Sequence, residues 1–179
     1  MLALLIIDMQ QGVCLQPTFF NAPKLVHAIN QRIQCYRQKK LPIIFIQHQD
    51  SELLPNSAAW QLMPQLDAQD QDAFIAKTHA NSFYQTNLAA YLAQHKITEL
   101  EICGAQTQYC VDSTIKFAHG LGFHLYSFPN ASSTTDHPDL TATQLIAFYE
   151  SIWQHRFLKF EDPLQKEYTN EHLPYEKYT

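Results

Sequence analysis

Apolar residues along this chain follow two alternating patterns, one typical of buried strands and the other of amphipathic helices. Short continuous apolar runs are typical of strands that are covered on both faces of a parallel sheet. These runs lie at residues 2–7, 41–46, 73–76, 99–103 and 123–128, and a last short strand is predicted at residues 156–160. Between the strands, apolar side chains recur at helical spacing. The helices are predicted at residues 22–38, 87–95, 107–119 and 138–154.

This alternation predicts an α/β fold, because parallel strands need crossover helices that cover both faces of the sheet. We expect a doubly wound three-layer sandwich around a mostly parallel sheet of about six strands, in the order 3-2-1-4-5-6. The whole chain, residues 1–179, is predicted to be one domain. Residues 47–72 are predicted to form a long polar surface excursion, and the polar tail from about residue 161 is expected to pack loosely.

Charge and composition argue against several classes of function. The chain has 12 Lys and Arg, 17 Asp and Glu and a formal net charge of -5, so no nucleic-acid partner is expected. No apolar run reaches the length of a membrane span, and the apolar start lacks the basic residues of a signal peptide. We therefore expect a cytoplasmic protein that acts on a small molecule. Its cysteines are expected to be reduced thiols: Cys14, Cys35, Cys103 and Cys110.

Cys110 is the cysteine in the most reactive predicted setting, near the start of the helix that follows the fourth strand. Unpaired backbone N–H groups and the helix dipole at such a position favour a thiolate and can stabilise an oxyanion. The alternative is a buried thiol that only fills the core.

A cysteine nucleophile needs a proton acceptor and a cation, and two residues at predicted strand ends are suited to these roles. Asp8 follows the first strand and Lys77 follows the third. Because the carboxyl ends of parallel strands meet at one edge of a sheet, these side chains could converge with Cys110. Spacing alone leaves the alternatives open: a turn-capping carboxylate and a solvated lysine.

Three segments of the chain carry a resemblance to a known family. They are residues 5–10 (LIIDMQ), residues 77–83 (KTHANSF) and residues 104–111 (GAQTQYCV). Together, and in this order, they resemble the isochorismatase-like cysteine hydrolases, which include nicotinamidases and carbamoylsarcosine amidohydrolases. The resemblance implies a doubly wound fold and a homo-oligomer, either a dimer or a tetramer.

The resemblance also implies roles for individual residues. Asp8, Lys77 and Cys110 correspond to a catalytic triad, and the Ala105–Gln106 peptide bond is expected to be cis. The amides of Gln106 and Cys110 would then face the oxyanion. The implied reaction is hydrolysis of a C–N bond in a small amide or N-carbamoyl compound through a thioester. Hydrolysis of a vinyl ether, which does not require the thiol in this family, is an alternative.

Nicotinamidases add a metal site built on an Asp-x-His pair after the second strand, and this chain has Gln47, His48, Gln49 and Asp50 there. Two ligands in that order do not predict a metal site, so we expect neither a metal nor another cofactor. His48 is instead predicted to bond to backbone groups at the strand end. Nicotinamidase activity stays an alternative. So do two other classes of protein: a flavodoxin-like electron carrier and a non-catalytic oligomeric binding protein.

Substrate-binding side chains are the least defined part of the prediction. Candidates lie in predicted loops or close to the three segments, where they could line a pocket: Gln10, Phe19, Trp60, Phe83 and Tyr109. Packing in the core or at a subunit interface is the alternative for the aromatic ones.

Overall fold

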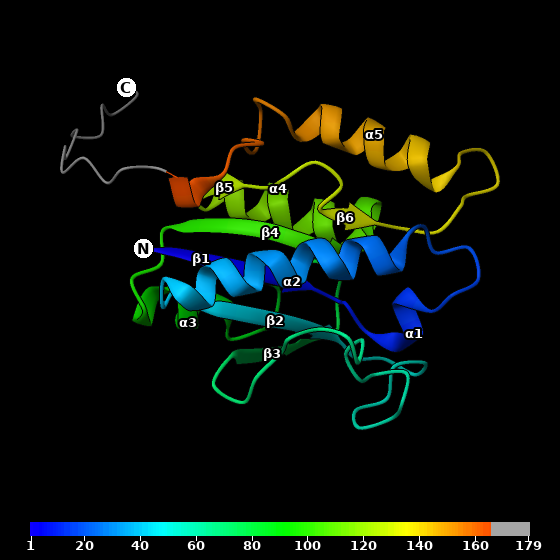
Figure 1. Cartoon of the computed structure of the whole chain (residues 1–179), viewed down its shortest axis with the longest axis horizontal. Coiled ribbons are helices and arrows are strands. Elements are labelled where there is room, and N and C mark those ends of the chain that lie inside the picture. The colour runs from blue at the N-terminus through cyan, green and yellow to red at the C-terminus, as the bar shows by residue number, and fades with distance from the viewer. Residues whose placement is uncertain (166–179) are drawn as a thin grey trace.

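The structure, a computed structural model that describes residues 1–165, is a three-layer α/β sandwich (Figure 1). Its strands are β1 (Leu2–Ile7), β2 (Ile43–His48), β3 (Ala73–Lys77), β4 (Glu99–Ala105), β5 (His124–Tyr126) and β6 (Ser132–Ser133). Its helices are α1 (Gln11–Cys14), α2 (Ala22–Gln38), α3 (Leu88–Gln94), α4 (Asp112–Gly120) and α5 (Ala142–Trp153). A π-helical turn precedes α4 at Thr107–Val111, and a 3₁₀ turn spans Pro163–Gln165.

The sheet is parallel throughout and has the order β3-β2-β1-β4-β5, with β6 paired to β4. The predicted fold class and the order of the first five strands are confirmed. The sixth strand is not the one that the apolar pattern predicted. After α5 the backbone N–H groups of Phe157 and Leu158 donate back to the carbonyl of Trp153, so the chain turns there. Only Lys159 then reaches the edge of β5.

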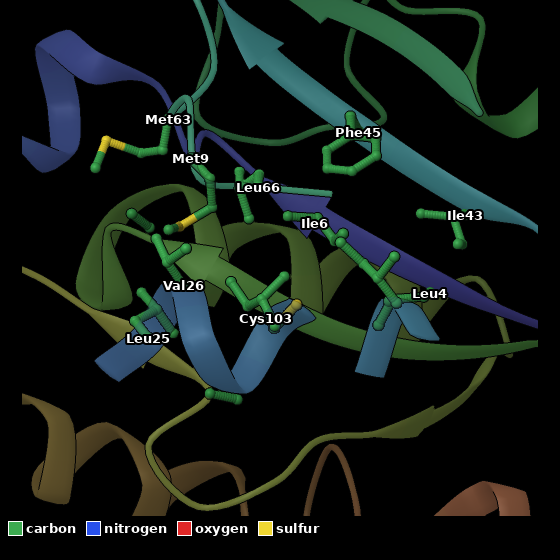
Figure 2. Close-up of a cluster of buried hydrophobic side chains, with 14 of the residues drawn as sticks. Leu4, Ile6, Met9, Leu25, Val26, Ile43, Phe45, Met63, Leu66 and Cys103 are labelled. Carbon is green, nitrogen blue, oxygen red and sulfur yellow. The ribbon is translucent and has the colours of Figure 1, made fainter. Parts of the chain in front are cut away.

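Side chains of the central strand β1 alternate between two cores because successive residues point to opposite faces of a sheet. Leu4 and Ile6 face α2, and Figure 2 shows them with Leu25, Val26 and Cys103 in that cluster. The intervening residues of β1 enter a second cluster with side chains of α3, α4 and α5. Every residue of β1 is buried, which explains why its sequence is a continuous apolar run.

The strand register brings three carboxyl ends to one edge of the sheet. Ile7 pairs with Ile46 on one side and with Gly104 on the other. Gly104 has a φ of +127°, and a Cβ atom there would lie 2.1 Å from the carbonyl oxygen of Ile7. Only glycine can therefore occupy this position of β4, so close to β1. The sheet edge that results carries Asp8 directly after β1 and the π-helical turn shortly after β4.

Two segments outside regular structure are tied to the sandwich. Residues 49–72 form the predicted excursion, and Asn30 of α2 bonds to the backbone of Gln65 and Asp67 in it. Near the end of the described chain, Asp162 lies 2.8 Å from the guanidinium of Arg32. The rest of the predicted loose tail, residues 166–179, lies outside the described residues. Within residues 1–165, no helix is long and apolar enough to cross a membrane.

Candidate active site

Asp8, Lys77 and Cys110 come from three different elements and meet at the carboxyl edge of the sheet. Lys77 Nζ lies 2.6 Å from Asp8 Oδ2 and 3.2 Å from Cys110 Sγ. The side chains of Lys77 and Asp8 are 0% and 3% exposed, so this ion pair is shielded from water. The predicted convergence of the three residues is confirmed.

The two oxygens of Asp8 have different surroundings. Oδ2 accepts from Lys77, whereas Oδ1 is buried and accepts no hydrogen bond within residues 1–165. Burial raises the pKa of the Asp8 carboxyl, and the positive charge and hydrogen bond of Lys77 oppose this rise. A buried carboxylate with one free oxygen is suited to accept and return a proton.

Burial also raises the pKa of the Cys110 thiol to about 12, with the Asp8 carboxylate adding to the rise and Lys77 opposing it. The sequence favoured a thiolate, from the position of Cys110 near a helix start. That expectation is wrong for the resting protein because burial and the carboxylate outweigh the cation. Cys110 is therefore a neutral thiol at neutral pH, and a reaction on its sulfur needs transfer of the thiol proton.

The segment between β4 and α4 is a π-helical turn closed by a bond from Val111 N–H to the Gln106 carbonyl at 3.3 Å. The Ala105–Gln106 peptide bond is cis, as the resemblance implied. A hydroxyl contact of 2.9 Å between Thr107 and Ser132 ties this turn to β6. Within the described residues, the backbone N–H of Gln106 donates to no protein acceptor. It is thus free for a ligand.

Two polar residues close to the three predicted catalytic side chains were not predicted as part of the site. His48 Nδ1 lies 3.1 Å from Lys77 Nζ, and His48 Nε2 lies 3.3 Å from Asp50 Oδ2. The predicted bonding of His48 to backbone holds for its main chain, but its ring contacts side chains. The contact follows from strand pairing, since His48 and Lys77 are direct partners in the β2–β3 register, and the sequence carried no local signal for it.

These contacts also show whether His48 could belong to a metal site of the nicotinamidase type. Both ring nitrogens of His48 already have partners, one a cation and the other a carboxylate. In the part of the chain that the structure describes, no group of three or more His, Cys, Asp or Glu side chains could hold a metal ion. These residues do not fit a nicotinamidase-type metal centre.

Gln10, predicted to bind substrate, makes hydrogen bonds within the protein. Its amide nitrogen donates to the carbonyls of His48 and Trp60, both at 2.9 Å. Its amide oxygen accepts from His48 N–H at 2.7 Å. The side chain is fully buried and bonds with both ends of its amide, so it links the end of β2 to the excursion.

The aromatic candidates divide into buried and accessible side chains. Phe19 and Phe83 lie in the two hydrophobic clusters, where Phe83 packs within 5.6 Å of Phe117 between ring centroids. Trp60 is half-buried, with an indole N–H that has no partner among the described residues, and Tyr109 is 53% exposed. Trp60 and Tyr109 are therefore the two aromatic candidates whose side chains are not fully buried.

A surface hollow of about 650 Å³ lies elsewhere, between β5 and residues 154–161. None of Asp8, Lys77 and Cys110 lines it, and its lining contains no Cys, Ser or Thr. The buried ion pair and the thiol meet instead at the sheet edge, which makes that edge the candidate active site.

The fold and these side chains together define the class, a doubly wound α/β protein with a site of the cysteine hydrolase type. The isochorismatase domain matches residues 2–149 of the chain, and the chain belongs to the isochorismatase family. It is thus an isochorismatase family hydrolase.

Solved structures support this assignment. One isochorismatase family protein is 48% identical, with a TM-score of 0.87 over 90% of this chain and 98% of its own. A cysteine hydrolase from Pseudomonas syringae pv. phaseolicola shares the fold, with a TM-score of 0.83 and 18% identity over 88% of this chain and 86% of its own.

Similarity to curated sequences is more distant. The isochorismatase family protein YddQ of Bacillus subtilis is 24% identical over 140 residues, which are 74% of this chain and 78% of that protein. Streptothricin hydrolase of Streptomyces noursei is 30% identical over 84 residues, which are 47% of this chain and 30% of that enzyme.

Proposed function

We propose that this protein hydrolyses a C–N bond in a small amide or N-carbamoyl compound, with Cys110 as the nucleophile. The observation that carries the proposal is the position of Lys77, whose ammonium contacts both the Asp8 carboxylate and the Cys110 sulfur. This arrangement places a nucleophile and a proton acceptor in contact with the same cation.

In the first half of the reaction, the Cys110 thiol gives its proton to Asp8, and the sulfur attacks the carbonyl carbon. A C–S bond forms while the carbonyl π electrons move to oxygen. Lys77 stabilises the sulfur as it becomes charged, which compensates for the raised pKa of the thiol. The free N–H of Gln106, together with that of Cys110, is proposed to stabilise the oxyanion.

The tetrahedral intermediate collapses when the oxyanion re-forms the carbonyl and the C–N bond breaks. Asp8 returns its proton to the leaving nitrogen, which departs as the amine or ammonia, and a thioester remains on Cys110. Water then gives a proton to Asp8 and attacks the thioester. The sulfur leaves, takes the proton back from Asp8 and restores the thiol, with the product acid released.

The test is ammonia or amine release from a panel of small primary amides and N-carbamoyl compounds. We expect turnover by the wild-type protein and none by Cys110→Ala, with Cys35→Ala as a matched control that keeps full activity. Mass spectrometry of an acid-quenched reaction should show an acyl adduct on Cys110. Retained C–N hydrolysis in Cys110→Ala contradicts the nucleophile. Vinyl ether cleavage that survives in the same variant favours the alternative reaction.

A further inference from the structure

The ammonium of Lys77 has three partners, which is as many as it has protons. Asp8 Oδ2 lies at 2.6 Å, His48 Nδ1 at 3.1 Å and Cys110 Sγ at 3.2 Å. An ammonium group can only donate hydrogen bonds. Nδ1 of His48 must therefore present its lone pair to Lys77, and the neutral imidazole must carry its proton on Nε2.

Asp50 is placed to hold that tautomer. Its Oδ2 lies 3.3 Å from His48 Nε2, while its Oδ1 accepts from the backbone N–H groups of Glu52 and Leu53, both at 2.8 Å. These two N–H groups lower the pKa of the Asp50 carboxyl, which is ionised at neutral pH. An ionised acceptor beside Nε2 favours the imidazole with its proton on that nitrogen.

The backbone of His48 is fixed as well as its ring. Gln10 bonds to both the N–H and the carbonyl of His48, and His48 pairs with Lys77 across β2 and β3. The imidazole is thus held from its main chain, from Asp50 and from Lys77. Such a ring can orient a neighbouring group at little further cost in conformational entropy.

We propose that His48 is a positioning residue, which directs the Lys77 ammonium between Asp8 and Cys110, and that Asp50 fixes the His48 tautomer needed for this. The inference rests on the function proposed for Lys77 and Cys110. In this proposal His48 does not contact the substrate. His48 acts through Lys77, as a carboxylate-oriented histidine acts through the group it contacts in other sites.

The charges that face His48 come from three elements: Lys77 at the end of β3, Asp8 after β1, and Asp50 beyond β2. Burial lowers the pKa of His48 and Lys77 lowers it further, whereas Asp8 and Asp50 oppose this change. The imidazole is therefore neutral at neutral pH and can accept from Lys77. Protonation of Nδ1 in acid would direct an N–H toward the ammonium and break the contact.

Nitrogen NMR of histidine-labelled protein tests the tautomer directly. In the wild-type protein we expect one resonance pair for His48 with a protonated Nε2 and an unprotonated Nδ1. In Asp50→Asn we expect a minor population with the proton on Nδ1 to appear, because Lys77 alone then favours the original tautomer. A wild-type His48 with its proton on Nδ1 would overturn the proposal.

Two substitutions then separate positioning from packing. His48→Asn places an amide oxygen close to where Nδ1 was, and this oxygen can accept from Lys77 but cannot titrate. His48→Leu keeps bulk and offers no acceptor. The readout is alkylation of Cys110 by iodoacetamide at a pH above the ordinary thiol pKa, with His27→Leu on the exposed face of α2 as the control.

We expect alkylation of Cys110 to slow by about tenfold in His48→Leu, which is at the lower end of effects seen when an orienting partner is removed. His48→Asn should stay within about threefold of wild type, as rescue by a conservative acceptor requires. Equal rates in both variants and the wild type would overturn the proposal. Equal losses in both variants would do so too, because they would indicate a packing role.

Neither measurement involves a substrate, so the outcome does not depend on which compound is hydrolysed. If amide hydrolysis persists in Cys110→Ala, the proposed function fails while the tautomer and the alkylation rates stand. If hydrolysis depends on Cys110 but both His48 variants react like the wild type, only the positioning role fails.

Discussion

Lys77 and Asp8 form an ion pair 2.6 Å long in which neither side chain reaches water. Removing one partner of such a buried pair leaves the other as an uncompensated buried charge. The pair therefore bears on the stability of the fold as well as on the proposed chemistry.

Replacing the cation should destabilise the protein strongly. Lys77→Met leaves Asp8 buried without a counter-charge, and breaking a buried pair in this way costs about 3–5 kcal/mol. Without Lys77 the pKa of Asp8 rises further above its unfolded value. The neutral form then contributes stability that is present in acid and lost as pH rises through the folded-state pKa. Urea unfolding should show the deficit at neutral pH and its reduction in acid.

The double variant Asp8→Asn with Lys77→Met is the control for this prediction. It removes both charges, so it should unfold at a higher urea concentration than Lys77→Met alone. A single Lys77→Met variant as stable as the wild type at neutral pH would show that the pair does not stabilise the fold.

Asp8→Asn should make Cys110 more reactive and the enzyme inactive. The Asp8 carboxylate raises the pKa of Cys110, whereas Lys77 lowers it and would remain. Without the carboxylate, the thiolate should form at lower pH and alkylation at neutral pH should accelerate by about tenfold, which corresponds to roughly one pKa unit. Turnover should be lost because no proton acceptor remains.

Peptide mass spectrometry after timed treatment with iodoacetamide, across a pH series, measures this change at Cys110. Cys35, half-buried on α2, reports any general change in accessibility. Slower labelling of Cys110 in Asp8→Asn would contradict the assigned effect of the carboxylate.

Strand ends were the part of the site that sequence could predict. Apolar runs located Asp8 and Lys77 directly after strands or at their ends, and parallel strands bring such positions to one edge. The pKa of Cys110 could not be predicted, because it depends on how deeply the folded chain buries the thiol beside Asp8. The contact of His48 with Lys77 depends on the β2–β3 register, which no local pattern specifies.

Some strands of the fold could likewise be predicted from the sequence and others could not. The order of β1 to β5 follows from the alternation of strands and helices, whereas β6 is only Ser132–Ser133 and has no apolar signature. Residues 156–160 have the composition of a strand, but the turn held by bonds to Trp153 leaves only Lys159 paired with β5. Local composition therefore predicted the central strands well and the edge poorly.

Gly104→Ala should disrupt the sheet edge itself. The new Cβ would lie 2.1 Å from the Ile7 carbonyl oxygen, and a φ of +127° is unfavourable for alanine. We expect a loss of more than about 3 kcal/mol in unfolding free energy, from overpacking and strain together.

Two other glycines provide matched controls for Gly104. Gly122 has a φ of +87° but open space around it, so Gly122→Ala should cost only about 1–2 kcal/mol of conformational strain. Gly120 at the end of α4 has an ordinary φ and open space, so Gly120→Ala should be neutral or stabilise by up to about 1 kcal/mol. Equal effects at all three positions would contradict the steric argument.

Substitution of Gln10 distinguishes a structural role from the substrate-binding role that its sequence position suggested. Gln10→Ala leaves the His48 N–H and carbonyl without their partner, which should cost about 1–3 kcal/mol in unfolding free energy. Because Gln10 orients His48 rather than a ligand, kcat should fall while KM changes little. Gln47→Ala, which removes one bond to the Trp60 carbonyl and none to His48, should affect kcat less. Steady-state kinetics and urea unfolding of the two variants measure this difference. A rise in KM without loss of stability in Gln10→Ala would instead support substrate binding.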